Sequence, residues 1–288
     1  MREHYRSLVI GIPTFDRRVF VEETARSIAA ARLDGGTEVT LLVVDDASSE
    51  YDEAFLRAIF PAGTEVVRRE ANSGGADFAC RDLLGRCLAF QTDAVLILDS
   101  DMLVGVDFVA AGLALLPRTD GCLSLFNTPN HPVLDRFDGL VTKATVGATG
   151  TLWDRDLAAE IHAAVGAGES WDWRFSHHLT ETGRRIFVCE RSLVQHLGFY
   201  AGQNSRPWSG DFGVGFPVET NETIGVLIEH AVHGQGLLGA RLLELGEEAR
   251  RQRDRIAALE ARIEDLETFE FSTVLRRFFR HLLRRIGA

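Results

Sequence analysis

Four apolar residues run directly into two carboxylates in the segment Val95-Leu96-Ile97-Leu98-Asp99-Ser100-Asp101. A short apolar run of this kind, with two β-branched residues, indicates a strand that is buried on both faces. In open α/β sheets ligands bind beyond the carboxyl ends of the strands, which is where Asp99 and Asp101 would lie. Two carboxylates one residue apart can share a hard divalent cation, and such an ion commonly also holds substrate phosphates. We therefore predict a metal site here; the alternative is an ordinary acidic loop or a helix N-cap.

Strands and helices alternate in the first hundred residues. Buried strands are expected at residues 8–12, 39–44 and 66–67, and helices at 20–32, at 51–59 and from 75 to about 90. This alternation indicates an α/β fold with a mostly parallel sheet and helices on both faces. Acidic residues follow three of the strands, at Asp16, at Asp45 with Asp46, and at Asp99 with Asp101. Three acidic loops at one edge of a sheet indicate a polar, metal-dependent site.

Composition limits the class of protein. The chain has 288 residues, 45% of them hydrophobic, which is enough for one large domain and an appendage. The net charge of −11 argues against nucleic acid as a general partner. No stretch approaches the roughly 18 apolar residues of a membrane span, and the first residues lack the core of a signal peptide. Four cysteines without a Cys-x-x-Cys spacing are typical of core residues in a reducing cytosol, so we expect a cytoplasmic protein.

Four short motifs follow one another in the first half of the chain. They are Ile12-Pro13-Thr14-Phe15-Asp16, Val43-Val44-Asp45-Asp46-Ala47-Ser48, Asn72-Ser73-Gly74-Gly75 and Leu98-Asp99-Ser100-Asp101. In order and spacing, over roughly residues 7–200, this set resembles the GT-A glycosyltransferases of family 2. The resemblance implies a GT-A fold, the Rossmann-like fold of nucleotide-diphospho-sugar transferases, and a nucleotide-sugar donor with UDP, GDP or dTDP.

The resemblance also implies which residues bind the donor. They are Pro13, Thr14 and Asp16 of the first loop, together with Asp46, Asn72 and Asp99. A carboxylate can accept a hydrogen bond from the N3–H of uracil or thymine, which suits Asp46. We expect Asp45 to be structural, and the alternative for both neighbours is capping of the following helix.

The acceptor side is expected in the second half of the domain. Residues 146–152 resemble the small-residue segment that lines the acceptor in this family, which assigns Thr149 and Gly150 to that side. Asp172 matches the family's general base, an aspartate that opens a helix and precedes a helix-ending glycine, here Gly183. The alternative is a helix N-cap aspartate between two core tryptophans.

Two tryptophans flank the expected base. Trp171 stands where the family usually has Glu, and Trp173 follows one position after the aspartate. Sugar faces stack on aromatic rings while carboxylates bind hydroxyls, so we assign both tryptophans to the acceptor side.

A late histidine completes the expected metal site. His196, within residues 193–198, resembles the family's late histidine motif. Imidazole is a common metal ligand, and His196 could reach the same ion as Asp101. The expected cofactor is Mn²⁺ or Mg²⁺, and the alternative is a purely structural histidine.

The C-terminal part has a different pattern. Apolar positions alternate spacings of four and three, interrupted by one glutamine, at Leu238, Leu242, Leu245, Ala249, Gln252, Ile256, Leu259, Ile263 and Leu266. Ile at position a with Leu at position d favours a parallel coiled coil, so we expect a homodimer. The alternative is a single helix that packs on its own catalytic domain.

The last fifteen residues are basic and amphipathic. Residues 274–288 carry five arginines and no acidic residue, with Phe and Leu on the other face of the expected helix. This pattern is typical of a membrane-surface anchor, so we expect peripheral contact with the cytoplasmic membrane face. The alternative is a helix that packs against its own dimer.

The expected organisation is a GT-A domain at 1–217, a connecting helix or linker at 218–236, a coiled coil at 237–268 and a basic amphipathic helix at 269–288.

These observations favour a metal-dependent, inverting glycosyltransferase that acts on a glycan or lipid-linked acceptor. One alternative is a sugar nucleotidyltransferase, which would normally carry a Gly-rich, basic phosphate loop after the first strand, where this chain has residues 13–16. The other is a catalytically inactive, glycan-binding dimeric scaffold.

Overall fold

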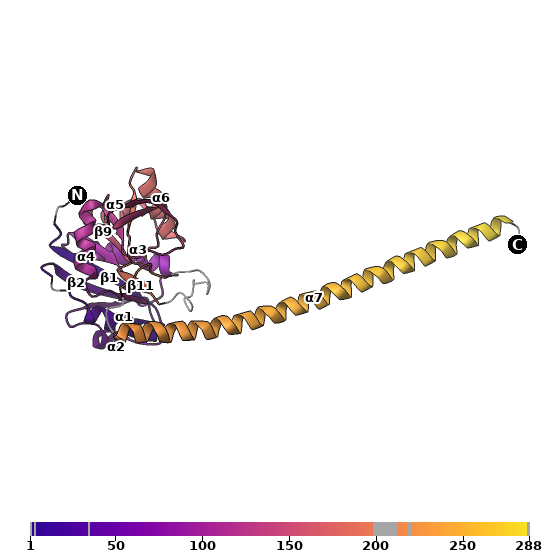
Figure 1. Ribbon diagram of the computed structural model, residues 1–288, viewed down its shortest axis with the longest axis horizontal. Coiled ribbons are helices and arrows are strands. Elements are labelled where there is room, and N and C mark those ends of the chain that lie inside the picture. The colour runs from indigo at the N-terminus through magenta and orange to yellow at the C-terminus, as the bar shows by residue number, and fades with distance from the viewer. Residues whose placement is uncertain (1, 3, 34, 198–211, 218–220, 287–288) are drawn as a thin grey trace. The chain divides into compact units, whose positions relative to one another are not determined.

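The computed structural model describes residues 2, 4–33, 35–197, 212–217 and 221–286. The chain divides into two compact units, residues 1–232 and 233–288. The first unit is a mixed α/β domain built on a nine-stranded sheet, with strand order β3-β2-β1-β4-β9-β6-β10-β8-β7 (Figure 1). The α/β class predicted from the alternating pattern is confirmed.

The first half of the sheet is parallel, as the sequence predicts. Its strands are β1 (Ser7–Thr14), β2 (Glu38–Asp45), β3 (Glu65–Arg68) and β4 (Ala94–Ile97), and the helices between them are α1 (Arg18–Ala30), α2 (Glu53–Ile59) and α3 (Ala76–Leu88). All four residues of β4 are buried, because helices cover both faces of the sheet at this position. The carboxyl ends of β1, β2 and β4 lie at one edge.

The second half departs from the predicted parallel order. Its strands are β6 (Cys122–Ser124), β7 (Val133–Phe137), β8 (Leu140–Lys143), β9 (Thr151–Asp154) and β10 (Ile186–Cys189). β9 runs antiparallel to both of its neighbours, β4 and β6, and β8 runs antiparallel to β7 and β10. The sheet is therefore mixed. A separate two-stranded ladder joins β5 (Met102–Val104) to β11 (Val194–His196).

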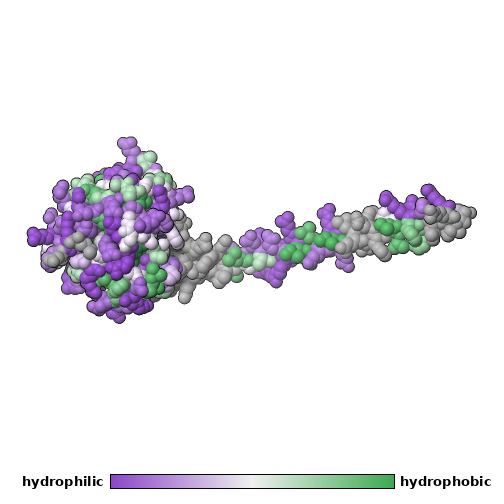
Figure 2. All heavy atoms as spheres, turned by 90° about the horizontal axis from the view of Figure 1, so that it is seen from above, coloured by the Kyte–Doolittle hydropathy of each residue, from purple (hydrophilic) through white to green (hydrophobic). Residues whose placement is uncertain are grey.

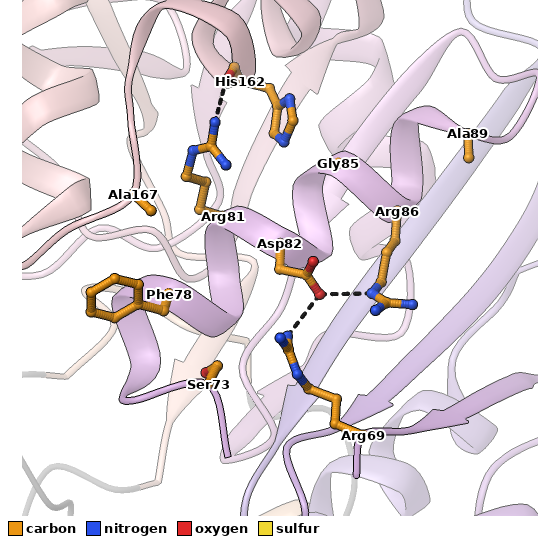
Figure 3. A pocket seen from close by; sticks show the side chains of 10 residues that line it. All are labelled: Arg69, Ser73, Phe78, Arg81, Asp82, Gly85, Arg86, Ala89, His162 and Ala167. Carbon is orange, nitrogen blue, oxygen red and sulfur yellow. Dashed lines mark hydrogen bonds and ion pairs between the residues drawn. The ribbon is translucent and has the colours of Figure 1, made fainter. Parts of the chain in front are cut away.

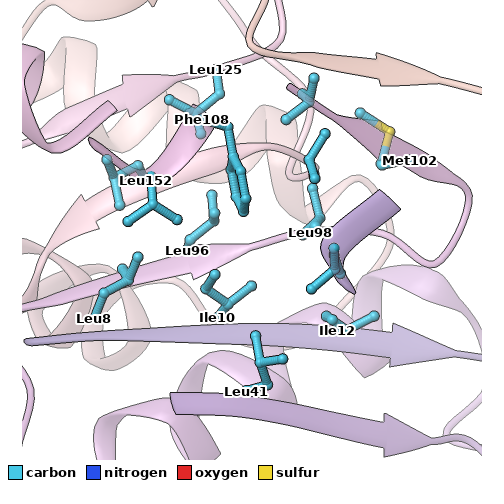
Figure 4. Packing of buried hydrophobic residues seen from close by; sticks show 14 of the residues in the cluster. Leu8, Ile10, Ile12, Leu41, Leu96, Leu98, Met102, Phe108, Leu125 and Leu152 are labelled. Atoms are coloured by element: carbon cyan, nitrogen blue, oxygen red, sulfur yellow. The ribbon is translucent and has the colours of Figure 1, made fainter. Parts of the chain in front are cut away.

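Two hydrophobic clusters cover the two faces of the sheet. The first contains residues of α1, α2 and α4 (Phe108–Leu115, followed by the short helix η1, Leu116–Arg118), and Figure 4 shows Phe108 packed over Ile10 and Leu96. The second contains residues of α3, α5 (Arg155–Ala164) and α6 (Trp171–Glu181). A glycine permits close packing here: a Cβ on Gly11 would lie 2.6 Å from the Cys87 sulfur of α3.

The C-terminal pattern forms one continuous helix, α7 (Asn221–Ile286), of 66 residues. Within residues 221–286, the expected connecting segment, coiled coil and basic helix are thus parts of a single helix. Among the seam residues, Ile256, Leu259 and Ile263 are more than half exposed, and Figure 2 shows apolar patches between polar residues along this helix. The side chains of Leu238, Leu242 and Leu266 lie outside the described residues, and pairing of the helix stays a prediction. No helix in the described ranges is long and apolar enough to cross a membrane.

Candidate active site

Asp101 and His196 lie side by side at the edge of the sheet. Asp101 follows β4 and is only 5% exposed. Its Oδ2 accepts a hydrogen bond from Arg17 Nη1 at 2.8 Å and lies 3.1 Å from His196 Nε2. The antiparallel pairing of β5 with β11 sets this contact, because it places His196 opposite Met102 and next to Asp101. The structure thus brings together two residues that the sequence assigns to one metal site.

The two carboxylates of the turn have opposite electrostatic surroundings. Burial and the charge of Asp101 raise the pKa of Asp99 to about 7, although His196 and the Thr149 hydroxyl oppose this shift. Burial alone would raise the pKa of Asp101, but the charges and hydrogen bonds of His196 and Arg17 outweigh it and lower that pKa to about 2. Asp101 is therefore the firmly ionised member of the pair.

The chemistry of this cluster fits a divalent cation in part. In the described ranges, no group of three or more His, Cys, Asp or Glu side chains is arranged to hold a metal ion. However, Asp101 Oδ1 is buried and has no hydrogen-bond partner among the described residues. Carboxylate oxygen and imidazole are suitable ligands for Mn²⁺, and Mg²⁺ is usually bound by one or two carboxylates together with substrate phosphates. Asp101 and His196 fit such an ion if the substrate supplies further ligands.

The loop after β1 is fastened to the loop after β2. The carboxylate of Asp16 accepts hydrogen bonds from the backbone N–H groups of Ser49 and Glu50 at 2.6 and 3.1 Å, and these bonds lower its pKa against the effect of burial. Thr14 is 2% exposed, and its carbonyl accepts from Asp46 N at 2.8 Å. Pro13, by contrast, is only half-buried. Asp16 is thus engaged in joining the two loops.

The predicted base-binding residue Asp46 is also well bonded. Ser73 donates to its carboxylate from the backbone N–H at 2.9 Å and from Oγ at 2.7 Å, and Arg69 Nε lies 3.3 Å away. Asn72 donates from Nδ2 to the Asp46 carbonyl at 3.3 Å. Asp45 is fully buried and binds Ser48 and Arg68, in keeping with the structural role expected for it.

Small residues of the predicted acceptor segment reach the end of β4. The backbone N–H of Asp99 donates to Thr149 Oγ1 at 3.1 Å, and Gly150 N donates to the Ile97 carbonyl at 2.8 Å. Gly150 has a φ of 66°, and a Cβ there would lie 3.1 Å from Val194. A larger residue at this point would push against β11, which carries His196.

The predicted base Asp172 lies in the first turn of α6 but does not cap that helix. The N–H groups of Ser170 and Trp171 instead donate to Asp77 of α3, at 2.9 and 3.0 Å. Asp172 is half-buried, and its Oδ1 accepts a hydrogen bond from Trp173 N at 2.8 Å. Burial raises the pKa of its carboxyl group, and the charge of Asp77 adds to this effect.

The two tryptophans have different environments. Trp171 is 1% exposed and packs edge-on against Phe175 at 5.1 Å in the core. Trp173 is 59% exposed and lies 6.4 Å from the ring of His131. The burial of Trp171 conflicts with the predicted contact to an acceptor, because its ring belongs to the buried apolar cluster. Trp173 alone can offer a face to a sugar.

The candidate base lies beside the first turn of α3. Asp77 in that turn accepts hydrogen bonds from the N–H groups of Ser170 and Trp171, which places the start of α6, with Asp172, next to the start of α3. Cys80 of the same helix is buried, and burial raises the pKa of its thiol well above its ordinary value.

A basic pocket of about 680 Å³ adjoins the predicted nucleotide loop (Figure 3). The residues that line it are Arg69, Ser73, Phe78, Arg81, Asp82, Gly85, Arg86, Ala89, His162 and Ala167. Arg69 and Arg86 both donate to Asp82, at 2.8 and 2.7 Å. Arg69 and Ser73 also contact Asp46, so two lining residues of this pocket bind the carboxylate that is expected to recognise the base.

Two residues of the site were missed by sequence reasoning. Arg17 pairs with Asp101, and Asp77 holds the start of α6. The available signal for Arg17 was its place directly after the donor motif. No local signal pointed to the role of Asp77, because the N–H groups that it binds belong to the start of another helix, α6.

Comparison with known proteins agrees with this architecture. Residues 9–133 match the family model described as glycosyl transferase family 2. Among solved structures, GalNAc-T7 with UDP, GalNAc and Mn²⁺ is 13% identical with a TM-score of 0.53, and the match covers 68% of this chain and 44% of that one. Staphylococcus aureus TarS 1-349 in complex with UDP is 17% identical with a TM-score of 0.49, and covers 65% of this chain.

The chain spans 59% of the length of that TarS structure. No curated protein sequence matches the chain significantly. Residues 9–133 are therefore similar to glycosyl transferase family 2, and the domain that contains them has a GT-A-like α/β fold.

Proposed function

We propose that the protein is a metal-dependent, inverting glycosyltransferase. It would move a sugar from a nucleotide-diphosphate sugar to a hydroxyl group of a glycan or lipid-linked acceptor. The observation that carries this proposal is the pairing of Asp101 with His196 at the carboxyl edge of the sheet, in a chain whose residues 9–133 match glycosyl transferase family 2. The GalNAc-T7 structure contains UDP and Mn²⁺, which makes UDP the first donor to test before GDP and dTDP.

Asp101 and His196 would hold Mn²⁺ or Mg²⁺, with Asp99 beside them. When bound, such an ion stabilises the negative charge that develops on the leaving nucleotide diphosphate. The uncommitted Oδ1 of Asp101 supports this assignment, because a buried carboxylate oxygen without a donor is costly unless a ligand satisfies it.

Asp172 would accept the proton of the acceptor hydroxyl as that oxygen attacks the anomeric carbon from the face opposite the diphosphate. A single displacement of this kind inverts the configuration at that carbon. Its raised pKa makes the carboxylate a stronger base than an exposed aspartate. The exposed ring of Trp173, one residue away, would stack on the acceptor sugar.

Donor turnover with and without EDTA tests the proposal. Purified protein is incubated with UDP-, GDP- and dTDP-sugars in Mn²⁺, and release of the nucleoside diphosphate is measured. We expect EDTA to abolish release and Asp101→Ala to abolish both turnover and metal-dependent nucleotide binding with the fold intact. Unchanged nucleotide affinity of Asp101→Ala in Mn²⁺ would contradict the metal assignment. Absence of turnover with every donor would favour a glycan-binding scaffold instead.

We also propose that α7 has two roles, as a parallel homodimeric coiled coil and as a peripheral membrane anchor on the cytoplasmic face. Exposed Ile256, Leu259 and Ile263 support the first role, because such a stripe is normally covered by a partner helix. Exposed Val274, Phe278 and Phe279 next to five arginines support the second.

Two truncations separate these roles of α7. Deletion of residues 274–288 should abolish binding to anionic liposomes and leave the dimer intact in light scattering. Deletion of residues 238–288 should yield a monomer that still turns over its donor. If the protein without residues 274–288 still floats with anionic liposomes, the membrane anchor is contradicted. If the protein without residues 238–288 stays dimeric, the coiled coil is contradicted.

A further inference from the structure

Two consecutive residues after β1 adopt a backbone conformation that L side chains rarely occupy. Asp16 has a φ of 49° and Arg17 a φ of 60°. Hydrogen bonds to the loop after β2 hold this conformation: Asp16 N donates to Ser48 Oγ at 2.8 Å, and Tyr51 Oη donates to the Asp16 carbonyl at 2.9 Å. Strain of this kind persists only where the surroundings over-determine it, and it clusters at ligand-binding sites.

The strained turn places the side chain of Arg17 next to Asp101. Its Nη1 lies 2.8 Å from Asp101 Oδ2, and its guanidinium carbon lies 4.3 Å from the centre of the Phe20 ring. A carboxylate at one end and an aromatic face beneath thus orient the guanidinium. The side chain as a whole keeps 25% of its surface exposed.

This ion pair leaves hydrogen-bond donors of Arg17 and an acceptor of Asp101 without partners among the described residues. Nε and Nη2 of Arg17 are buried and have no acceptor among the described residues. Oδ1 of Asp101 is likewise buried and has no donor. The pair could have formed a two-pronged contact that uses both carboxylate oxygens, but it forms a single bond. Free donors and a free acceptor therefore lie within one salt bridge.

We infer that Arg17 binds the diphosphate of the nucleotide-sugar donor, next to a cation held by Asp101. This inference rests on the proposed function. A diphosphate with its cation meets both needs at once: phosphate oxygens accept from the guanidinium, and the cation takes Asp101 Oδ1. A planar guanidinium matches phosphate geometry better than an ammonium, and its fixed charge would favour departure of the nucleoside diphosphate.

The neighbouring arginine provides a matched control. Arg18 is the next residue in the chain, has 54% of its side chain exposed, and donates to Glu22 at 3.0 Å. Its guanidinium also lies over an aromatic ring, that of Phe55, at 4.3 Å. Arg17 and Arg18 thus differ in their place relative to Asp101 rather than in chemistry. The variants are Arg17→Gln, Arg17→Lys and Arg18→Gln, each checked for an unchanged thermal melting profile.

The experiment compares UDP with uridine, which lacks the diphosphate, by calorimetry and NMR titration in Mn²⁺ and in EDTA. Hydrogen bonds to a charged group correspond to a loss of about 10–100-fold in affinity. We expect Arg17→Gln to bind UDP about 10–100-fold more weakly in both media, with uridine affinity unchanged. Arg17→Lys should lie between wild type and Arg17→Gln, and Arg18→Gln should equal wild type.

Three results would overturn the inference. Equal UDP affinity of Arg17→Gln and wild type would exclude a diphosphate contact. A loss that occurs in Mn²⁺ but vanishes in EDTA would mean that Arg17 only positions Asp101 for the metal. A wild type that binds none of UDP, GDP and dTDP would overturn the proposed function, and this inference with it.

Discussion

Replacing Asp172 by Asn removes a proton acceptor and changes little else in the structure. The amide oxygen of Asn can keep the 2.8 Å hydrogen bond from Trp173 N. The first N–H groups of α6 are held by Asp77, so the helix start does not depend on Asp172. The fold should therefore survive, and any loss of transfer should report on base catalysis.

Loss of one positioned acid–base group typically lowers a rate by about 10²–10⁴-fold. We expect Asp172→Asn to reduce sugar transfer by that factor while donor affinity stays unchanged, because the carboxylate acts on the acceptor. The matched control is Glu169→Gln, which alters an exposed carboxylate three residues away and should stay within a few-fold of wild type. Transfer is followed as product formed under saturating donor and Mn²⁺.

The pH dependence gives a second readout of the same change. Since burial raises the pKa of Asp172, wild-type transfer should fall as the pH drops through this raised pKa. A raised folded-state pKa also means that ionisation of Asp172 costs the folded protein stability at neutral pH, and that this cost disappears below the unfolded-state pKa. Asp172→Asn should therefore melt at or above the wild-type temperature at neutral pH, with the difference shrinking in acid.

Two results would refute this reasoning. Transfer by Asp172→Asn within a few-fold of wild type, with a large loss in Glu169→Gln, would move the base to Glu169. A clearly lower melting temperature of Asp172→Asn at neutral pH would show that the carboxylate makes a stabilising contact, which contradicts the electrostatic argument.

Two further predictions concern packing and the acceptor. Gly11→Ala should lower the free energy of unfolding by about 1–3 kcal/mol in a denaturant titration, because its Cβ would overlap α3; Gly35→Ala, whose Cβ would meet its nearest atom at 4.0 Å, should be close to neutral. Trp173→Ala should raise the acceptor KM roughly 2–10-fold at constant donor affinity, whereas Trp171→Ala should instead cost about 3–5 kcal/mol of stability. The reverse pattern for the tryptophans would place the acceptor elsewhere.

The central strand and its acidic turn could be predicted because their signal is local. An apolar run of strand length that ends in two carboxylates specifies a buried strand and a polar loop without reference to the rest of the chain. The contact of Asp101 with His196 depended on a resemblance, because nothing in the residues between them encodes the pairing of β5 with β11.

Strand order and the Arg17 contact could not be predicted in the same way. β9 comes late in the chain, yet it lies between β4 and β6 and runs antiparallel to both. An apolar run does not specify which strand it will pair with, since strand pairing depends on packing between distant segments. Arg17 reaches Asp101 only because the loop after β2 imposes a left-handed backbone that neither Asp16 nor Arg17 favours by itself.

The different fates of the two tryptophans, in contrast, follow from helix geometry that the sequence already contains. Successive residues of an α-helix are turned by about 100°, so residues four apart share a face and residues two apart do not. Trp171 and Phe175 are four apart and pack together in the core, which turns Trp173 outward. The apolar spacing in this helix therefore assigns Trp171 to the core and leaves Trp173 exposed beside Asp172, where the proposed acceptor would bind.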